Sequence, residues 1–130
     1  MSGKKRILII ANDPSDIWTI GQDMIGNGFL VTATTCASDG FRQLERNRFD
    51  YLIVDGTIQE VSLFTFLAYC RRYFPETKTI VLTDPALERP QEKEPLAGAN
   101  YCVPNPMNLE VIYSIISGMD VDKSTVGANF

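Results

Sequence analysis

Five short apolar runs recur along the chain at regular distances. They cover residues 7–10, 30–33, 51–54, 79–82 and 99–103, and most are rich in Ile, Val or Leu. Such a run is typical of a strand that is covered on both faces, and the segments between the runs have the spacing of helices. The alternation predicts an α/β fold, with a parallel sheet and helices on both of its faces.

The segments between the strands carry the start and stop signals of helices. The first helix is predicted to begin after Asp13, a capping residue, with Pro14 in its first turn. It ends near residues 26–28, and the other well-marked helices cover about 38–47, 62–74 and 106–119. The predicted core stripes are Ile17, Ile20, Met24 and Ile25 in the first helix, Phe41 and Leu44 in the second, and Leu109, Ile112, Ile116 and Met119 in the last, widened by Val111, Tyr113 and Ile115.

Two segments depart from an ordinary helical pattern. Pro85, Pro90 and Pro95 fall between the fourth and fifth strands, where each interior proline costs a helix about 3 kcal/mol. At most a turn or two of helix is expected there. The third helix is apolar over more than one face, which indicates either a helix wedged between the sheet and a neighbour or a partner surface that uses Tyr69 and Tyr73.

Length and composition bound the class of protein. The chain has 130 residues, of which 45% are hydrophobic and 22% charged, so it fits one soluble domain with a single core. We expect this domain to cover residues 1–120 and residues 121–130 to be a flexible tail or the start of a linker. The net charge of −4 argues against a nucleic-acid surface, and the apolar run before Asn12 is too short for a signal peptide or a membrane span. We therefore expect a cytoplasmic protein.

The cysteines and the absence of histidine limit the chemistry. Cys36, Cys70 and Cys102 show no C-x-x-C spacing, and without histidine there is no pattern for a zinc site. A Ser-His or Cys-His nucleophile is excluded for the same reason. We expect three buried or half-buried thiols and no enzymatic activity.

Polar residues follow the predicted strands at their carboxyl ends. In a doubly wound sheet, ligands and reactive groups collect in the crevice outside these ends. The residues placed there are Ala11, Asn12 and Asp13 after the first strand, Asp55 and Gly56 after the third, Thr83 and Asp84 after the fourth, and Pro104, Asn105 and Pro106 after the fifth.

Four motifs in this order resemble a known family. They read "ILIIANDPSD" from Ile7, "FDYLIVDG" from Phe49, "IVLTD" from Ile80 and "GANYCVPNP" from Gly98. Over about residues 4–120 the chain is similar to the receiver domain of bacterial two-component response regulators. The resemblance implies a flavodoxin-like, five-stranded parallel sheet in the order 2-1-3-4-5.

The resemblance also implies a site, and the sequence departs from it. Receiver domains transfer a phosphoryl group to an aspartate after the third strand, with Mg²⁺ held by that aspartate and an acidic pair after the first strand. Asp55 holds the acceptor position, but Ala11 and Asn12 stand where the acidic pair is found. Thr83 matches the family's hydroxyl residue, whereas Asn105 replaces its lysine. Only two of these functional residues are therefore retained.

Other departures point the same way. Asp84 stands where the family has a small residue, and a like charge at ~5 Å costs about 1 kcal/mol when well screened. Asp13 is the expected helix cap, so its carboxylate should accept from backbone donors and not hold a metal. Asp13 and Asp55 are the weak candidates for a cation, and no resident metal or cofactor is expected. The family's aromatic switch position falls on Cys102, with Tyr101 one residue early and on the other face of the strand.

Three functions remain open from the sequence. The first is a degenerate receiver, or pseudo-receiver, that signals by protein–protein interaction with phosphorylation weakened or lost. The second is a working phosphoacceptor receiver, modified on Asp55 by a histidine kinase and dependent on Mg²⁺. The third is a small-molecule-binding flavodoxin-like module, although the chain has neither a G-x-G-x-x-G motif nor a P-loop.

The resemblance suggests where a partner would bind. Receiver domains dimerise or dock effectors through the face formed by the fourth and fifth elements. On this chain the corresponding positions include Tyr101, Cys102, Val111 and Tyr113. We expect a signalling partner or a fused effector domain, or a homodimer, at this face, without direct contact to nucleic acid or membrane.

Overall fold

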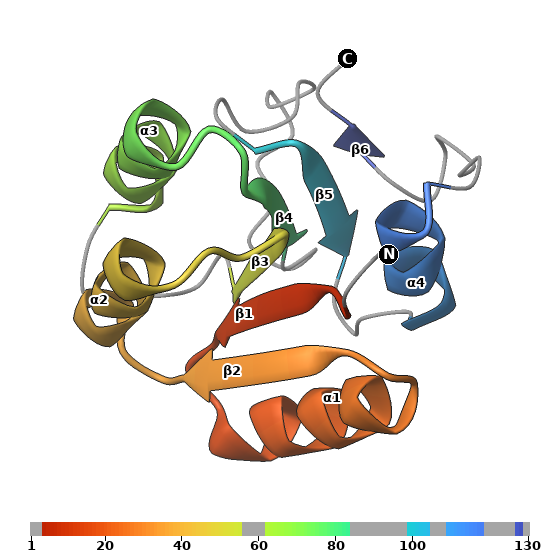
Figure 1. Ribbon diagram of the computed structural model, residues 1–130. Coiled ribbons are helices and arrows are strands. Elements are labelled where there is room, and N and C mark those ends of the chain that lie inside the picture. The colour runs from red at the N-terminus through yellow and green to blue at the C-terminus, as the bar shows by residue number, and fades with distance from the viewer. Residues whose placement is uncertain (1–3, 56–61, 84–98, 105–108, 119–126, 129–130) are drawn as a thin grey trace.

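Six strands form one sheet in the order β2-β1-β3-β4-β5-β6. The computed structural model describes residues 4–55, 62–83, 99–104, 109–118 and 127–128 (Figure 1). The strands are β1 (Arg6–Ile10), β2 (Leu30–Thr34), β3 (Tyr51–Asp55), β4 (Lys78–Thr83), β5 (Tyr101–Pro104) and β6 (Gly127–Ala128). The first five are parallel, which confirms the predicted flavodoxin-like sheet and its 2-1-3-4-5 order.

The short strand β6 lies in the segment expected to be a tail. It pairs antiparallel with β5, with Tyr101 opposite Ala128 and Cys102 opposite Gly127. The rest of residues 121–130 lies outside the described part of the chain. Gly127 and Ala128 thus have backbone partners on the outer edge of β5, while the assignment of residues 121–130 as a flexible tail or the start of a linker stays a prediction. Sequence patterns cannot show such pairing, since Gly and Ala carry no strand signal.

Four helices are described. They are α1 (Pro14–Gly26), α2 (Ala37–Arg46), α3 (Leu63–Tyr73) and α4 (Leu109–Ile116). Ser62 is the N-cap residue of α3 as predicted, although its side chain makes no capping hydrogen bond. After α4, Ser117 and Gly118 form a turn, and Gly118 has a φ of 74°, so the helix ends before the predicted Met119. The proline-rich segment 84–96 lies outside the described residues.

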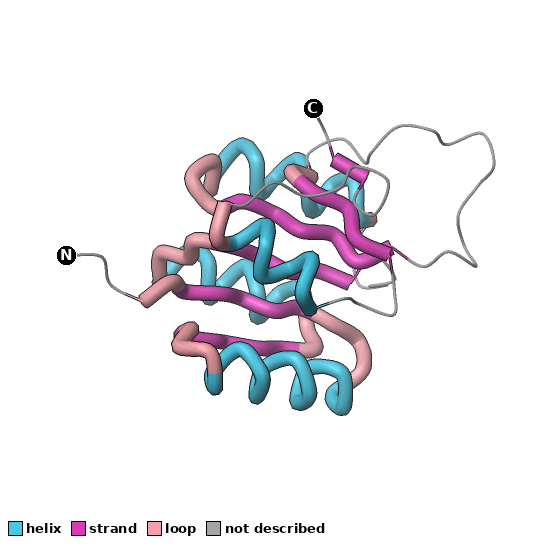
Figure 2. The backbone as a smooth tube through the Cα atoms, turned by 90° about the vertical axis from the view of Figure 1, so that its right-hand side faces the viewer, coloured by secondary structure: helices cyan, strands magenta, loops and turns pink. Residues whose placement is uncertain are grey.

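The helices cover both faces of the sheet, as Figure 2 shows. On one face Ile20 and Met24 of α1 and Ile112 of α4 pack on Ile7, Ile9 and Ile53 of the sheet. On the other face Leu44 of α2 and Phe66 and Leu67 of α3 pack on Leu8, Leu52 and Val81. Successive residues of each strand belong to opposite clusters, which explains why the strands are continuously apolar. The two-sided core predicted from the sequence is confirmed.

One predicted core residue of α1 is exposed. Ile25 leaves 51% of its surface in contact with solvent, while Met24 is fully buried. One residue turns the helix by about 100°, so the buried face that holds Ile20 and Met24 cannot hold Ile25 as well. The prediction of Ile25 as a core residue is therefore wrong. The predicted burial of the cysteines is confirmed, because Cys70 and Cys102 are buried and Cys36 is half-buried.

Candidate functional site

The carboxyl ends of β1, β3 and β4 meet at one edge of the sheet. Ile10 pairs with Val54 in the β1–β3 register, and Asp55 pairs with Leu82 in the β3–β4 register. Ala11, Asp55 and Thr83 therefore follow or end three neighbouring strands at the same level. Asp55 and Thr83 are both half-buried, which gives each a side chain that borders on solvent. The structure thus places the acceptor-position aspartate and the threonine as predicted.

Ala11 contributes an apolar wall beside this aspartate. It is 3% exposed and belongs to the core cluster on the α1 side of the sheet. Its backbone N–H donates to the carbonyl oxygen of Thr34 at 3.2 Å, which continues the β1–β2 ladder beyond the last strand residue. A buried methyl group therefore lies where a receiver domain has the first carboxylate of its acidic pair.

Asp13 is committed to the start of α1. Its Oδ1 accepts hydrogen bonds from the backbone N–H and the hydroxyl of Ser15, each at 2.9 Å. Its φ of −96° and ψ of 114° are those of an N-cap residue, so the predicted capping role is confirmed. Asn12 precedes it and is exposed. One oxygen of the Asp13 carboxylate is thus occupied by the helix terminus and is a poor ligand for a cation.

The described residues around Asp55 offer few ligands for a divalent cation. Among them, no group of three or more His, Cys, Asp or Glu side chains lies close enough to hold a metal ion. Magnesium is usually bound through one or two carboxylates together with water, and Ala11 offers no such oxygen. The predicted site residues Asp84 and Asn105 lie outside the described residues.

The residues predicted to form the partner face are partly or fully buried. They are Tyr101, Cys102, Val111 and Tyr113. Cys102 is 8% exposed and packs in the core cluster on the α2–α3 side, so it contributes to the interior and not to an interface. Tyr101 is half-buried against the opposite cluster, which places the two residues on different faces of β5 as predicted. Val111 is half-buried against that same cluster.

Tyr113 is half-buried and makes contacts within the molecule. Its ring stacks on Phe29 with centroids 5.7 Å apart, and its hydroxyl donates to the Oδ2 of Asp23 in α1. Desolvation raises the pKa of Tyr113 from 10.0 to about 12, and the hydrogen bond to Asp23 and the charge of that carboxylate add to the effect. Asn27, at the end of α1, donates to the same hydroxyl at 3.4 Å. Tyr113 therefore joins α4 to α1, a role that the sequence pattern did not reveal.

The thiols of Cys70 and Cys36 are packed against other parts of the protein. Burial raises the pKa of the Cys70 thiol from 9.0 to about 12, which keeps it protonated and unreactive. The Sγ of Cys36 lies 2.8 Å from the hydroxyl oxygen of Ser38. The burial of Cys70 and the partial burial of Cys36 agree with the predicted packing of these thiols.

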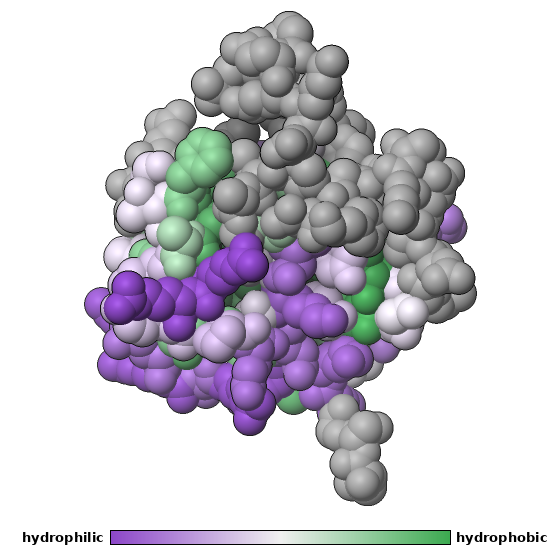
Figure 3. Space-filling view, turned by 90° about the horizontal axis from the view of Figure 1, so that it is seen from above, coloured by the Kyte–Doolittle hydropathy of each residue, from purple (hydrophilic) through white to green (hydrophobic). Residues whose placement is uncertain are grey.

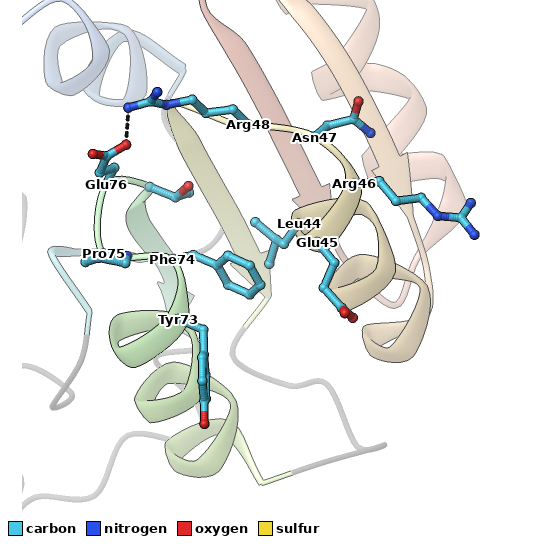
Figure 4. Close-up of a pocket in the computed structure, with 10 residues that line it drawn as sticks. Leu44, Glu45, Arg46, Asn47, Arg48, Tyr73, Phe74, Pro75 and Glu76 are labelled. Atoms are coloured by element: carbon cyan, nitrogen blue, oxygen red, sulfur yellow. Dashed lines mark hydrogen bonds and ion pairs between the residues drawn. The ribbon is translucent and has the colours of Figure 1, made fainter.

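A groove of about 500 Å³ lies at the opposite edge of the sheet from Asp55. It separates the carboxyl ends of α2 and α3, and Figure 4 shows Phe74 directed toward Leu44 inside it, with the Arg48–Glu76 ion pair at its rim. The apolar pattern of the third helix indicated Tyr73 as a possible partner residue, but no sequence pattern indicated the groove. The exposed aromatic residues of the third helix were the signal available.

The chain is similar to known proteins in its fold and not detectably in its sequence. The chain matches no protein-family model and no curated protein. The chemotaxis response regulator CheY4 of Vibrio cholerae superposes with a TM-score of 0.76 at 18% identity, covering 88% of this chain and 98% of that one. A CheY-like receiver domain protein from Methanospirillum hungatei gives 0.75 at 21% identity, covering 89% and 93%. The response regulator TrrA from Thermotoga maritima, solved with Mg²⁺ and BeF, gives 0.75 at 17% identity, covering 88% and 97%.

These similarities define the class of the protein by its fold. The chain has a flavodoxin-like, doubly wound α/β fold. More narrowly, it has the fold of CheY-like response-regulator receiver domains, as the resemblance of its motifs implied. Among the described helices, none is both long and apolar enough to cross a membrane.

Proposed function

We propose that the chain is an atypical receiver domain that acts in signal transduction through protein–protein interaction, with Mg²⁺-dependent phosphorylation of the aspartate weakened or lost. The observation that carries this proposal is the surroundings of Asp55. The neighbouring strand end supplies the buried methyl of Ala11, and the Asp13 carboxylate accepts from Ser15 at the start of α1.

The physical reason why phosphorylation of Asp55 is weakened is the shortage of positive charge around it. A carboxylate attacks a phosphoryl group only when a cation neutralises the charge on the transferring oxygens. With Ala11 in place of an acidic residue and Asn105 in place of the lysine, both sources of positive charge are weakened. Asp84 adds a negative charge to the same region of the sequence. Each change disfavours phosphoryl transfer, and together they favour a domain that signals by binding alone.

The test is incubation of the chain with acetyl phosphate and Mg²⁺, followed by intact mass. We expect no stoichiometric gain of a phosphoryl group, no sub-millimolar Mg²⁺ affinity by calorimetry, and no change in amide spectra with beryllofluoride. The variant that combines Asn12→Asp with Asn105→Lys is the gain-of-function control, and it should bind Mg²⁺ more tightly than the wild type. Stoichiometric phosphorylation of wild-type Asp55 would contradict the proposal.

A working phosphoacceptor is the second candidate. It is favoured by the retention of Asp55 and Thr83 at neighbouring strand ends, both half-buried. In this case Asn12, Asp13 and Asp55 would supply a poor cation site. Asp55→Asn would then abolish a kinase-dependent output, whereas the proposal above predicts an unchanged output.

The remaining expectations belong to the same proposal. The chain is not an enzyme, holds no resident cofactor and works in the cytoplasm without direct contact to nucleic acid or membrane. Its output passes to a signalling partner or a fused effector domain, with homodimerisation through the fourth-to-fifth element face as a further option. The third hypothesis, a small-molecule module, predicts cofactor absorbance or a ligand that copurifies with the chain.

A further inference from the structure

Helix α3 exposes a surface with unusually little charge. From Leu63 to Cys70 it has no charged residue, and Tyr69 and Tyr73 are 43% and 55% exposed. A helix that is apolar beyond its core stripe is normally covered by another part of the protein. Here the sheet covers only the side that holds Phe66 and Leu67. The outer side of α3 therefore has the composition of a contact surface.

Four aromatic rings from α2, α3 and the residue after α3 form a connected group with Tyr69 in contact with the other three, which we call the aromatic row: Phe41, Tyr69, Tyr73 and Phe74. The Phe41 and Tyr69 centroids are 4.8 Å apart, those of Tyr69 and Tyr73 are 4.5 Å apart, and Tyr69 lies 6.4 Å from Phe74. Rings that already pack on one another lose little freedom when a partner covers them. Aromatic anchors of this kind carry much of the energy of protein interfaces.

The aromatic row leads into the groove between the carboxyl ends of α2 and α3. Phe74 is half-buried inside the groove, and Tyr73 lies at its edge (Figure 4). The ion pair of Arg48 and Glu76 spans the far rim, with both side chains largely exposed. An exposed pair of this kind stabilises a fold only slightly, so it can open for a ligand. The groove therefore continues the surface of the aromatic row.

Arginines outnumber acidic residues on α2, α3 and the groove, in a chain whose net charge is −4. The exposed residues Arg42, Arg46, Arg48, Arg71 and Arg72 are five of the twelve basic residues, against Asp39, Glu45 and Glu76 from the same helices and groove. Arg72 lies over the Tyr73 ring at 5.5 Å. Figure 3 shows hydrophobic atoms beside strongly hydrophilic ones on the left, the side of α2 and α3 in Figure 1. This part of the surface therefore combines aromatic side chains with a surplus of positive charge.

We propose that the aromatic row, the groove and Arg72 together form the docking site for an acidic, amphipathic helix of a partner protein. Apolar anchors of that helix cover Tyr69 and Tyr73, and one of its carboxylates faces Arg72. A polyanion such as RNA is disfavoured by the acidic residues within the rim and by the negative charge of the whole chain. The groove residues precede β3 and β4, so the site lies at the opposite end of these strands from Asp55 and is not in contact with it.

The test is selection of peptides from a random library displayed on phage, with the full chain as target and the Arg72→Glu, Tyr73→Ser double variant as counter-target. We expect the enriched peptides to be acidic, with Leu, Phe or Trp at helical spacing. Synthetic copies should bind the wild type at least 10-fold more tightly than either single variant, and affinity should fall as salt is added.

Two exposed aromatic residues outside the site provide matched controls. Trp18 is 69% exposed on α1, on the other face of the sheet, and Phe64 lies on the side of α3 away from Tyr73. Trp18→Ser and Phe64→Ser should leave peptide affinity within twofold of the wild type, and all variants should keep the wild-type unfolding midpoint. Three outcomes overturn the proposal: peptides that are not acidic, peptides that bind independently of Arg72 and Tyr73, and self-association of the chain through this face.

Discussion

Asp13 is the residue whose side chain decides how α1 begins. Its carboxylate satisfies the backbone N–H of Ser15, one of the donors that a helix terminus leaves without an intrahelical partner. The same residue follows the two positions where receiver domains hold their metal. Its commitment to the cap is one physical reason why, among the described residues, few carboxylates could share a cation with Asp55.

Replacing Asp13 with alanine should destabilise the fold by about 1 kcal/mol, because the cap is lost and the Ser15 N–H has no replacement acceptor. Urea denaturation followed by circular dichroism measures the change. Asp13→Asn is the control, since asparagine caps as well as aspartate does, and it should stay close to the wild type. Equal losses in both variants would show that charge and not capping is responsible.

Gly40 permits α2 to approach β1 closely. A Cβ atom there would overlap the side-chain end of the fully buried Ile10 and lie 3.0 Å from its Cγ1. Gly40→Ala should therefore cost about 1–3 kcal/mol through overpacking, although alanine is the better helix former.

Gly26 provides the contrast for this substitution, because a Cβ atom there meets no atom within 4 Å. Gly26→Ala at the end of α1 should leave the free energy of unfolding unchanged or raise it by about 0.5 kcal/mol. Chemical denaturation of both variants gives the comparison. A Gly40→Ala variant as stable as Gly26→Ala would mean that Ile10 can move aside freely.

At the scale of elements, α4 is fixed to the rest of the domain from two directions. Its apolar side packs on the sheet through Ile112, Ile115 and Ile116, and Tyr113 reaches sideways to Asp23 of α1. This contact uses a residue that we expected at a partner surface. A partner that binds there has to accept Tyr113 in its present position or break its contact with α1.

Tyr113→Phe should loosen α4 while keeping the ring stacked on Phe29. The loss of one hydrogen bond to a charged acceptor predicts destabilisation by about 1–2 kcal/mol, concentrated in α1 and α4. Hydrogen exchange followed by mass spectrometry should show faster exchange in residues 109–118 than in α2 or α3. Uniformly faster exchange in all helices would contradict a local role.

At the scale of the whole molecule, the free energy of unfolding should fall as the pH becomes alkaline. Burial raises the pKa of Cys70 from 9.0 to about 12, desolvation and Asp23 raise that of Tyr113 from 10.0 to about 12, and desolvation raises that of Tyr51 as well. A group with a raised pKa binds its proton more tightly in the folded state, so its contribution is complete below pH 9 and is lost as pH rises toward 12.

The urea midpoint should therefore fall between about pH 9 and pH 12. Tyr113→Phe removes one of the titrating groups and should make this fall less steep. Equilibrium denaturation at several pH values for both proteins measures the effect. A wild-type midpoint that is constant over this interval would refute the prediction.

Particular residues show how far sequence reasoning reached. The strand and helix positions followed from period, because burial on two faces leaves continuous apolar strands and one-sided helices. Asp13, Asp55 and Thr83 could be placed at the sheet edge because parallel strands align their carboxyl ends. Ile25 was misplaced because hydrophobicity alone does not fix the angular limit of a helix stripe. Cys102 was predicted at a partner surface, but its side chain points from β5 into the core.

The sequence by itself determined the α/β class, the strand order implied by its motifs and the residues available around Asp55. These depend on local periodicity and on chain order. Only the tertiary structure decided that β6 covers the edge of β5, that Tyr113 contacts Asp23 and that Tyr69 and Tyr73 remain exposed beside a groove. Each of these joins or separates segments that are distant along the chain. Their contacts depend on packing geometry, which no local pattern of residues encodes.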